Sequence, residues 1–321
     1  MSSGGIKGQD SAISFLRRSL GKERTAHAYI FSGPRGVGKM STALYFAKAM
    51  NCGAAHTDRP CGKCDSCTAM EKGAHPDLFI FAPQKPGSSV KIDAVRELIK
   101  DISLRPYKAR KKVCIIDEAG SMTREASNAL LKTLEEPPPD SVLILIAEDT
   151  AVLLPTIVSR AQVVRFFALR AGDVEVILAQ DRTLSPGQAR VLARFSGGSP
   201  GKALEYMEKD FFRKRDMIAG ASSGRRLLEL DFDNTPREDL GLYLDIMLSW
   251  YRDIIAAKSD AGGFVALIHE DKHDVIKAEA GTLDADYLEG VTHDIISTTF
   301  FLGQSANAKL AMNTLLLRMA G

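Results

Sequence analysis

The chain has 321 residues, of which 45% are hydrophobic and 26% are charged, a composition typical of a globular protein with a full hydrophobic core. Lysine and arginine number 42 against 40 aspartates and glutamates, so no overall field points to nucleic acid, a membrane surface or an acidic substrate. The N-terminus lacks the basic and then apolar order of a signal peptide, and no run approaches the roughly 20 apolar residues of a membrane helix, so we expect a cytoplasmic protein with no membrane partner.

The first half of the chain alternates predicted helices and strands. Apolar residues at helical spacing predict helices at residues 9–21, 41–51, 93–102 and 124–136. Short apolar runs predict strands at residues 28–31, 78–81, 113–116 and 142–146. The last two runs are continuous, as in strands that are covered on both faces. The alternation therefore predicts a parallel sheet with helical crossovers.

Beyond Arg165 the strand patterns cease. Helical patterns follow at residues 174–179, 187–195, 202–208, 240–257 and 284–319. We expect an α/β fold with three domains. These are a P-loop parallel-sheet domain over residues 1–165, a small helical domain over 166–208 and an all-helical domain over 209–321.

A glycine-rich turn between the first predicted strand and the next helix matches a phosphate-binding loop. Gly33, Gly36 and Gly38 would let backbone N–H groups face phosphates at the helix N-terminus. Lys39 would reach the outer phosphates. Met40 stands where this loop has serine or threonine, and its thioether is a poor ligand for Mg²⁺. We therefore expect ATP and Mg²⁺ to bind weakly or not at all.

Two acidic residues end the predicted strand at 113–116. Asp117 would hold the magnesium shell and Glu118 would polarise a water. Both stand at the carboxyl edge of a parallel sheet, where ligands of such folds collect. The alternative is that they only cap the helix that begins at Arg124.

Four cysteines lie within residues 52–67, at Cys52, Cys61, Cys64 and Cys67. In a reducing compartment this spacing favours a metal over disulfides. Four thiolates fill a tetrahedral Zn²⁺ site and leave no position for a water, so the zinc would be structural. An iron–sulfur cluster is the chemical alternative, because it also takes four thiolates. His56 competes less well as a ligand.

The densest basic run lies just before the strand at 113–116 and comprises Arg105, Lys108, Arg110, Lys111 and Lys112. Such a run suits either contact with a DNA backbone or a solvated loop that balances nearby carboxylates. No base-reading motif is present in the sequence. Any DNA contact is therefore expected to follow backbone shape.

A series of motifs resembles, in the same order, those of bacterial clamp-loader ATPases of the AAA+ class. They are residues 27–39, the four cysteines, and residues 116–118, 128–137 and 154–160. The resemblance covers roughly residues 5 to 210. It implies a AAA+ P-loop domain with an inserted zinc module at 52–67, a helical lid domain and a helical collar domain. It also implies zinc rather than an iron–sulfur cluster.

Within this family, departures from the motor subunits gamma and tau favour the delta-prime type. Besides Met40, the sensor position falls on Ala147 or Glu148, neither of which can donate to a γ-phosphate. Gly201 stands where motors carry a second sensor arginine. Arg160, in contrast, is kept, and the resemblance implies that it acts as an arginine finger in a neighbour's ATP site.

The resemblance therefore implies a part of the DNA polymerase III holoenzyme that is not an independent ATPase. Its partners would be gamma or tau and delta in a hetero-pentamer, the sliding clamp and primed DNA. Two alternatives remain: a gamma- or tau-like motor that hydrolyses ATP despite Met40, and a stand-alone zinc-containing DNA-binding protein. Arg160 could also be a plain surface or helix-capping arginine.

Overall fold

The computed structural model describes residues 6–21, 25–55, 58–83, 88–180, 183–221, 232, 235–259, 265–304 and 307–320. The chain divides into two compact units. Unit 1 consists of Met1–Asp173 and Gly198–Gly201, and unit 2 consists of Val174–Gly197 and Lys202–Gly321.

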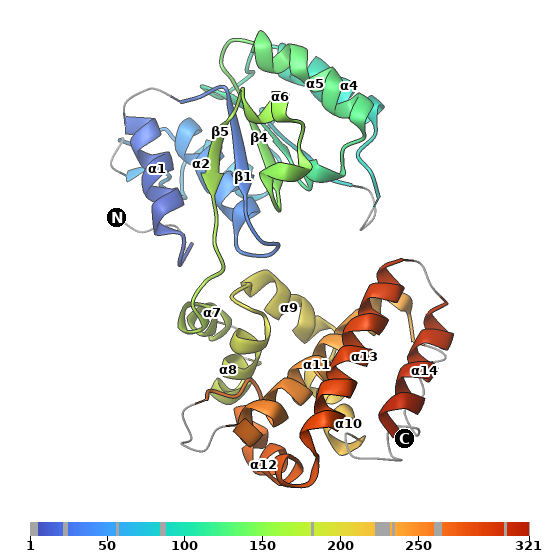
Figure 1. Cartoon of the computed structure of the whole chain (residues 1–321). Coiled ribbons are helices and arrows are strands. Elements are labelled where there is room, and N and C mark those ends of the chain that lie inside the picture. Colours follow the sequence, from blue (N-terminus) through green and yellow to red (C-terminus); the bar gives the residue numbers. More distant parts are fainter. Residues whose placement is uncertain are drawn as a thin grey trace. The chain divides into compact units, whose positions relative to one another are not determined.

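Unit 1 is built on a sheet of five parallel strands in the order β2-β3-β4-β1-β5 (Figure 1). The strands are β1 (Ala28–Ser32), β2 (Leu78–Phe81), β3 (Lys112–Ile116), β4 (Ser141–Ala147) and β5 (Gln162–Arg165). Every residue of β3 and β4 is buried, as the continuous apolar runs predict for central parallel strands. Their carboxyl ends therefore form a rigid edge on which a site can be built.

Helices cover both faces of this sheet. They are α1 (Asp10–Gly21), α2 (Lys39–Asn51), α3 (Asp65–Glu71), α4 (Ile92–Ser103), α5 (Arg124–Glu135) and α6 (Pro155–Val158). The alternation of side chains along β1 shows the two layers: Ile30 joins the core cluster formed with α4 and α5, whereas the Tyr29 ring packs edge-on against Phe46 of α2 at 5.2 Å. The sheet is thus enclosed between helical layers.

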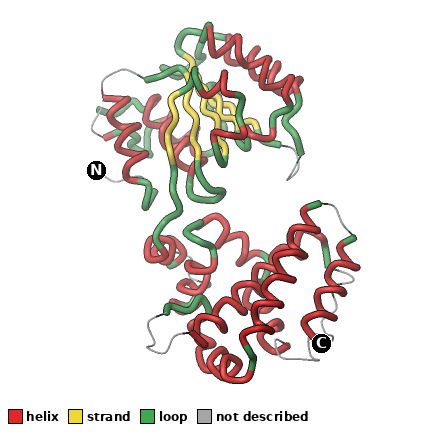
Figure 2. Tube along the Cα trace, in the orientation of Figure 1, coloured by secondary structure: helices red, strands yellow, loops and turns green. Residues whose placement is uncertain are grey.

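Among its described residues unit 2 contains helices and no strand (Figure 2). Its helices are α8 (Pro186–Phe195), α10 (Phe211–Ala221), α11 (Arg237–Ser259), α12 (His273–Thr282), α13 (Ala285–Gly303) and α14 (Ala308–Ala320), together with most of α7 (Ala171–Leu178) and α9 (Pro200–Glu208). Trp250 of α11 is fully buried and donates from Nε1 to Glu279 Oε2 at 3.0 Å. A buried, hydrogen-bonded tryptophan fixes α11 against α12.

The expected fold class, a P-loop parallel-sheet domain followed by helices, is confirmed. The periodic stretch at residues 284–319 forms two helices, α13 and α14, instead of one. The three-domain boundaries at 165 and 208 stay a prediction. No helix in the described part of the chain has the length and apolar character needed to cross a bilayer.

Candidate functional site

The phosphate loop joins the end of β1 to the start of α2. Gly36 and Gly38 have φ angles of 75° and 97°, a left-handed backbone that favours glycine. Gly38 is the N-cap of α2, so the loop leads directly into the first free N–H groups of that helix. This geometry is the one that the glycine pattern predicts for an anion-binding turn.

Lys39 is buried at the first position of α2. Its Nζ donates to Pro34 O at 2.6 Å and also to Gly33 O. Burial lowers the pKa of Lys39, and the nearby carboxylates of Glu148 and Asp117 offset part of that effect. Since an ammonium carries three donors, one remains for an anion in the loop.

In the described structure, the hydroxyls nearest in sequence to Met40 do not replace the serine or threonine hydroxyl that the motif has at position 40. Ser41 is exposed, and Thr42 Oγ1 donates back to Gly38 O at 2.8 Å, within its own helix. A hydroxyl engaged in this way is not directed at a cation beside the loop. The loop therefore keeps its backbone and its lysine but carries a thioether directly after the lysine, where the motif has a hydroxyl.

Acidic side chains gather at the carboxyl edge of the sheet. Asp117 directly follows β3, and its Oδ1 accepts the N–H of Glu118 at 2.9 Å. Glu118 has a φ of 47°, an uncommon conformation for a residue with a side chain, which often marks a functional turn. Glu148 follows β4, where the sensor position was expected, and acts electrostatically on Lys39 together with Asp117. The structure thus brings Lys39, Asp117 and Glu148 together at one edge, while the described interactions do not join Glu118 to Lys39.

The Gly198–Gly201 segment packs directly on the phosphate loop. Ser199 Oγ donates to Arg35 O at 2.8 Å, and the Gly201 N–H donates to Gly36 O at 2.9 Å. A Cβ at Gly201 would lie 2.8 Å from Gly36 Cα, closer than real Cβ contacts allow. An arginine at position 201 would therefore require a different placement of this segment.

Gln9 is a site residue that sequence reasoning missed. Its side chain is 4% exposed, and Nε2 donates to Val37 O at 3.1 Å and to Phe167 O at 2.8 Å. The amide therefore ties the phosphate loop to the chain that leaves β5. Its only signal in the sequence was a polar residue at the start of a predicted helix.

Arg160 follows α6, outside the phosphate loop. Its Nη2 donates to Glu135 Oε1 at 2.8 Å, and Nη1 donates to Thr156 O at 3.0 Å and Ser159 Oγ at 3.3 Å. The side chain remains 36% exposed. Among the described residues, no hydrogen bond or ion pair joins Arg160 to the phosphate loop.

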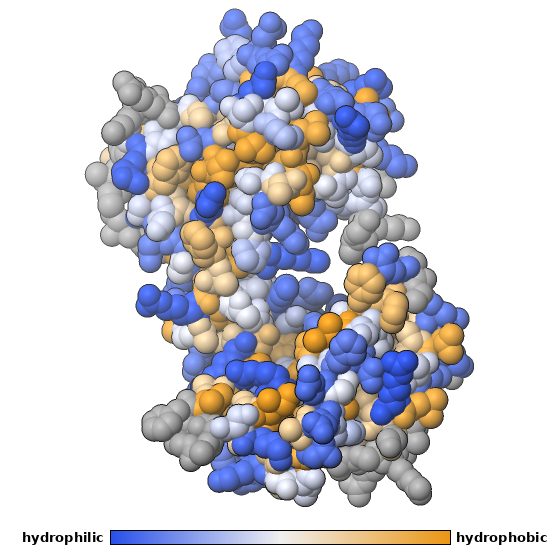
Figure 3. All heavy atoms as spheres, viewed as in Figure 1, coloured by the Kyte–Doolittle hydropathy of each residue, from blue (hydrophilic) through white to orange (hydrophobic). Residues whose placement is uncertain are grey.

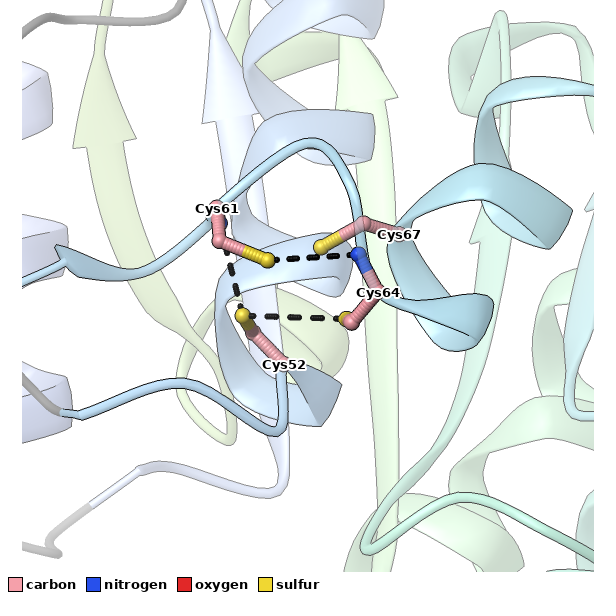
Figure 4. Close-up of side chains that lie close together, drawn as sticks. All are labelled: Cys52, Cys61, Cys64 and Cys67. Atoms are coloured by element: carbon pink, nitrogen blue, oxygen red, sulfur yellow. Dashed lines mark hydrogen bonds between the residues drawn. The ribbon is translucent and has the colours of Figure 1, made fainter.

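The four cysteines form a compact cluster that runs from the C-cap of α2 at Cys52 to Cys67 in α3. The sulfur atoms of Cys52, Cys61, Cys64 and Cys67 all lie within 4.8 Å of one another and point toward one another (Figure 4). Tetrahedral zinc with Zn–S bonds of about 2.3 Å requires sulfurs about 3.8 Å apart. The donor set and the spacing therefore fit a four-coordinate metal. His56 lies outside the described residues.

Backbone N–H groups point at the sulfurs of this cluster. Hydrogen bonds from the N–H groups of Cys67 and Gly53 lower the pKa of Cys64 to about 6, whereas burial raises the pKa of Cys67 to about 12. A bound divalent cation would favour the thiolate on both. Burial also raises the pKa of Cys114, in the core of β3, to about 12, and the thiol therefore stays protonated. Cys114 is not one of the four cysteines of the cluster.

The basic run before β3 serves partly structural purposes. Lys112 is buried, with Nζ donating to Asp101 O at 3.0 Å, and Lys111 pairs with Asp140 at 2.8 Å. Arg105, Lys108 and Arg110 are exposed. Only these three therefore remain for the DNA contact that the sequence suggested.

The chain is similar to DNA polymerase III subunits. The family model described as "DNA polymerase III, delta subunit" matches residues 8–170. DNA polymerase III subunit delta' of Bacillus subtilis (strain 168) is 32% identical over 285 residues, which cover 85% of this chain and 84% of that relative. The subunit delta' of Pseudomonas aeruginosa is 36% identical and covers 73% of this chain and 71% of its own.

A tau subunit is also similar to part of this chain. DNA polymerase III subunit tau of Escherichia coli (strain K12) is 37% identical over 236 residues, or 71% of this chain. The match spans only 36% of tau. The present chain thus matches the delta' relatives over most of their length and tau over a minor part.

Proposed function

Because the chain belongs to the DNA polymerase III delta-prime family of clamp-loader subunits, we propose that it assembles with gamma or tau and with delta to load a sliding clamp onto primed DNA. In this assembly it supplies Arg160 to the ATP site of a neighbouring subunit. Its own nucleotide site, comprising Gly33, Gly36, Gly38, Lys39, Asp117 and Glu118, is degenerate. It is a subunit of a DNA-synthesising holoenzyme and not an independent ATPase.

The position of Arg160 is the observation that carries this proposal. Its guanidinium is held by oxygens of α5 and α6, is partly exposed and, among the described residues, makes no hydrogen bond or ion pair with its own phosphate loop. An arginine that enters a neighbour's site stabilises the charge that develops on the transferred phosphoryl group. Being fixed on its own protomer and open to solvent suits that role.

The nucleotide site of this chain supports the proposal that the chain is not an independent ATPase. Met40 provides no hard oxygen for Mg²⁺, and the sensor position falls on Ala147 or Glu148, neither of which can donate to a γ-phosphate. Gly201 contacts the loop backbone where a motor has an arginine. Each of these features weakens the binding of MgATP or its hydrolysis in this chain.

A motor of the gamma or tau type is the second candidate. It is favoured by the retained phosphate-loop backbone and by the buried Lys39 with a donor to spare. Those features permit nucleotide binding, but turnover also needs a bound Mg²⁺. Hydrolysis by the isolated chain distinguishes the two candidates.

We assign the four-cysteine cluster to structural Zn²⁺. Four sulfurs complete a tetrahedral shell and leave no position for a catalytic water. The cluster runs from the C-cap of α2 into α3, away from the basic loop in sequence. Its contribution is to hold the segment between these helices in place.

Exposed hydrophobic side chains support assembly with other subunits. On α13 and α14 they are Ile296, Phe300, Phe301, Leu310 and Leu317. Figure 3 shows hydrophobic residues at the surface over these helices, among hydrophilic ones. Clusters of exposed hydrophobic residues mark interaction sites more often than free surface. We therefore assign α13 and α14 to contacts with the other loader subunits.

The test is reconstitution with the chain's own gamma or tau and delta subunits. Arg160→Ala should strongly lower the DNA-stimulated ATPase of the assembly, since a trans arginine contributes roughly 10³ to 10⁵ in rate at the site it serves. Arg165→Ala, which removes another exposed arginine nearby in sequence, is the matched control and should leave the rate unchanged. Full activity of the Arg160→Ala assembly would rule out the arginine finger.

A further inference from the structure

The guanidinium of Arg160 is paired with a carboxylate at the end of a core helix. Glu135 is the last residue of α5, and its Oε1 accepts a hydrogen bond from Arg160 Nη2 at 2.8 Å. The two residues are far apart in the chain but lie on elements that pack together. The hydrophobic cluster of unit 1 contains Leu134, beside Glu135, and Ile157, three residues before Arg160. Both partners therefore extend from backbone that the core fixes.

The Arg160–Glu135 ion pair contributes little to the stability of the fold. The Arg160 side chain is 36% exposed and the Glu135 side chain 51% exposed, and ion pairs at such sites contribute little to folding. What the pair does is restrict a long side chain to one orientation. Thr156 O and Ser159 Oγ hold Nη1 of the same guanidinium, so three oxygens fix its plane.

Donors remain on the guanidinium after these contacts. Arginine carries five N–H groups, of which the three oxygens take three. Two are left for the oxygens of a phosphoryl group, so Glu135 need not release Arg160 when a phosphate binds. An arginine that is already oriented loses less conformational freedom on binding than a free one.

We propose that Glu135 is a positioning residue that orients Arg160 for the ATP site of the neighbouring subunit. This inference rests on the proposed function, because it requires Arg160 to act in trans. Glu135 touches no substrate in it and acts only through the guanidinium.

The chain offers a matched control next to Glu135. Glu136 is also an exposed glutamate, but no hydrogen bond or ion pair of its side chain occurs among the described residues. Glu135→Gln and Glu136→Gln each remove one negative charge at the same end of α5. Only the first removes the carboxylate that faces Arg160.

The experiment measures kcat and KM for ATP in the DNA-stimulated reaction of the reconstituted loader. In separate reconstitutions, this chain carries Glu135→Gln, Glu136→Gln, Arg160→Ala or the double change E135Q/R160A, and the other subunits are unaltered. We expect Glu135→Gln to lower kcat by about 1.5- to 5-fold, the range for loss of an exposed ion pair, with KM unchanged. Glu136→Gln should have no effect. Glu135→Gln should add nothing in the Arg160→Ala background, since its effect passes through the arginine.

Thermal unfolding of each isolated variant separates a positioning role from a structural one. The Glu135→Gln chain should unfold at the temperature of the Glu136→Gln chain. The inference is overturned if kcat for Glu135→Gln is unchanged or raised, or if kcat in the double variant falls below that of Arg160→Ala. In either case, a low rate for Arg160→Ala still supports the proposed function. If Arg160→Ala itself is fully active, the proposed finger fails and the role of Glu135 fails with it.

Discussion

Met40 stands beside a phosphate loop whose backbone is otherwise suited to an anion. The loop keeps left-handed Gly36 and Gly38 and a buried Lys39, and the proposed defect in Mg²⁺ binding lies in the side chain of Met40. Thr42 cannot substitute because its hydroxyl donates to Gly38 O. At the scale of residues, the proposed defect is therefore local, and a single substitution tests it.

Met40→Thr should restore the missing oxygen. Hydrogen bonds and contacts to charged groups contribute about 1.5 to 3 kcal/mol, so we expect the Mg²⁺-dependent affinity for ATP to rise by about tenfold or more. Calorimetric titration of ATP with and without Mg²⁺ measures this effect. Met40→Leu, which keeps the volume without adding oxygen, should behave like the unaltered chain. Equal affinities of all three would show that Met40 is not the limiting defect.

Residue roles were only partly predictable from the sequence. The glycines and Lys39 follow a local pattern, so their placement was foreseen. The contacts of Gln9 with the loop, of Gly201 with Gly36 and of Glu135 with Arg160 join residues that are distant in the chain. Such contacts depend on tertiary packing, which periodicity and motif spacing do not encode.

Among the elements, the loop between α4 and β3 is held by a buried carboxylate. Asp77 is fully buried, and its oxygens accept the N–H groups of Tyr107, Lys108 and Ala109 at 2.7, 2.7 and 2.8 Å. Burial raises the pKa of Asp77, but these three hydrogen bonds outweigh it, and the pKa lies below its usual value. The carboxylate therefore stabilises the fold in its charged form.

Asp77→Asn should weaken the fold by roughly 1 to 3 kcal/mol at neutral pH, because one acceptor oxygen is lost and a donor is buried in its place. The folded-state pKa is lowered, so this stabilisation is present above the unfolded-state value of about 3.9 and is lost as the pH falls through the folded-state pKa. In urea unfolding from neutral pH down to about pH 3, the difference in free energy of unfolding between the unaltered chain and Asp77→Asn should shrink. Asp93→Asn, at an exposed position, is the control. A difference that is independent of pH would contradict this role.

The cysteine cluster makes a prediction about metal content. The chain as purified should hold about one zinc, and Cys64→Ser should lose it and unfold at a lower temperature, since a structural site needs all four ligands. Elemental analysis and thermal unfolding measure both. Cys114→Ala removes a buried thiol outside the cluster and should keep the metal. Iron and sulfide in place of zinc would support the alternative cluster.

The elements themselves were predictable where they are long or continuously apolar. Strands β3 and β4 are buried along their length, and continuous apolar runs in the sequence predicted both of them. Strand β5 was not identified, because it is short, lies at the edge of the sheet and has only one buried residue, Val164. The division between α13 and α14 was missed because helical spacing of apolar residues continues on both sides of it.

At the scale of the whole molecule, the proposed function places the chain within an assembly. Phe300 and Phe301 of α13 are 63% and 55% exposed, an unfavourable placement for two aromatic side chains in an isolated protein. Phe300→Ser with Phe301→Ser should therefore reduce assembly with gamma or tau and delta while the isolated chain stays folded. Size-exclusion chromatography with light scattering measures assembly, and Val275→Ser on α12 is the control. Unimpaired assembly would place the interface elsewhere.

ATP hydrolysis by the isolated chain tests the central claim most directly. The proposed degeneracy of the nucleotide site predicts that the isolated chain with saturating MgATP hydrolyses ATP no faster than its Lys39→Ala variant, even though Arg160 is intact. Rapid hydrolysis by the isolated chain that Lys39→Ala abolishes would contradict the account, because it would make this subunit a motor.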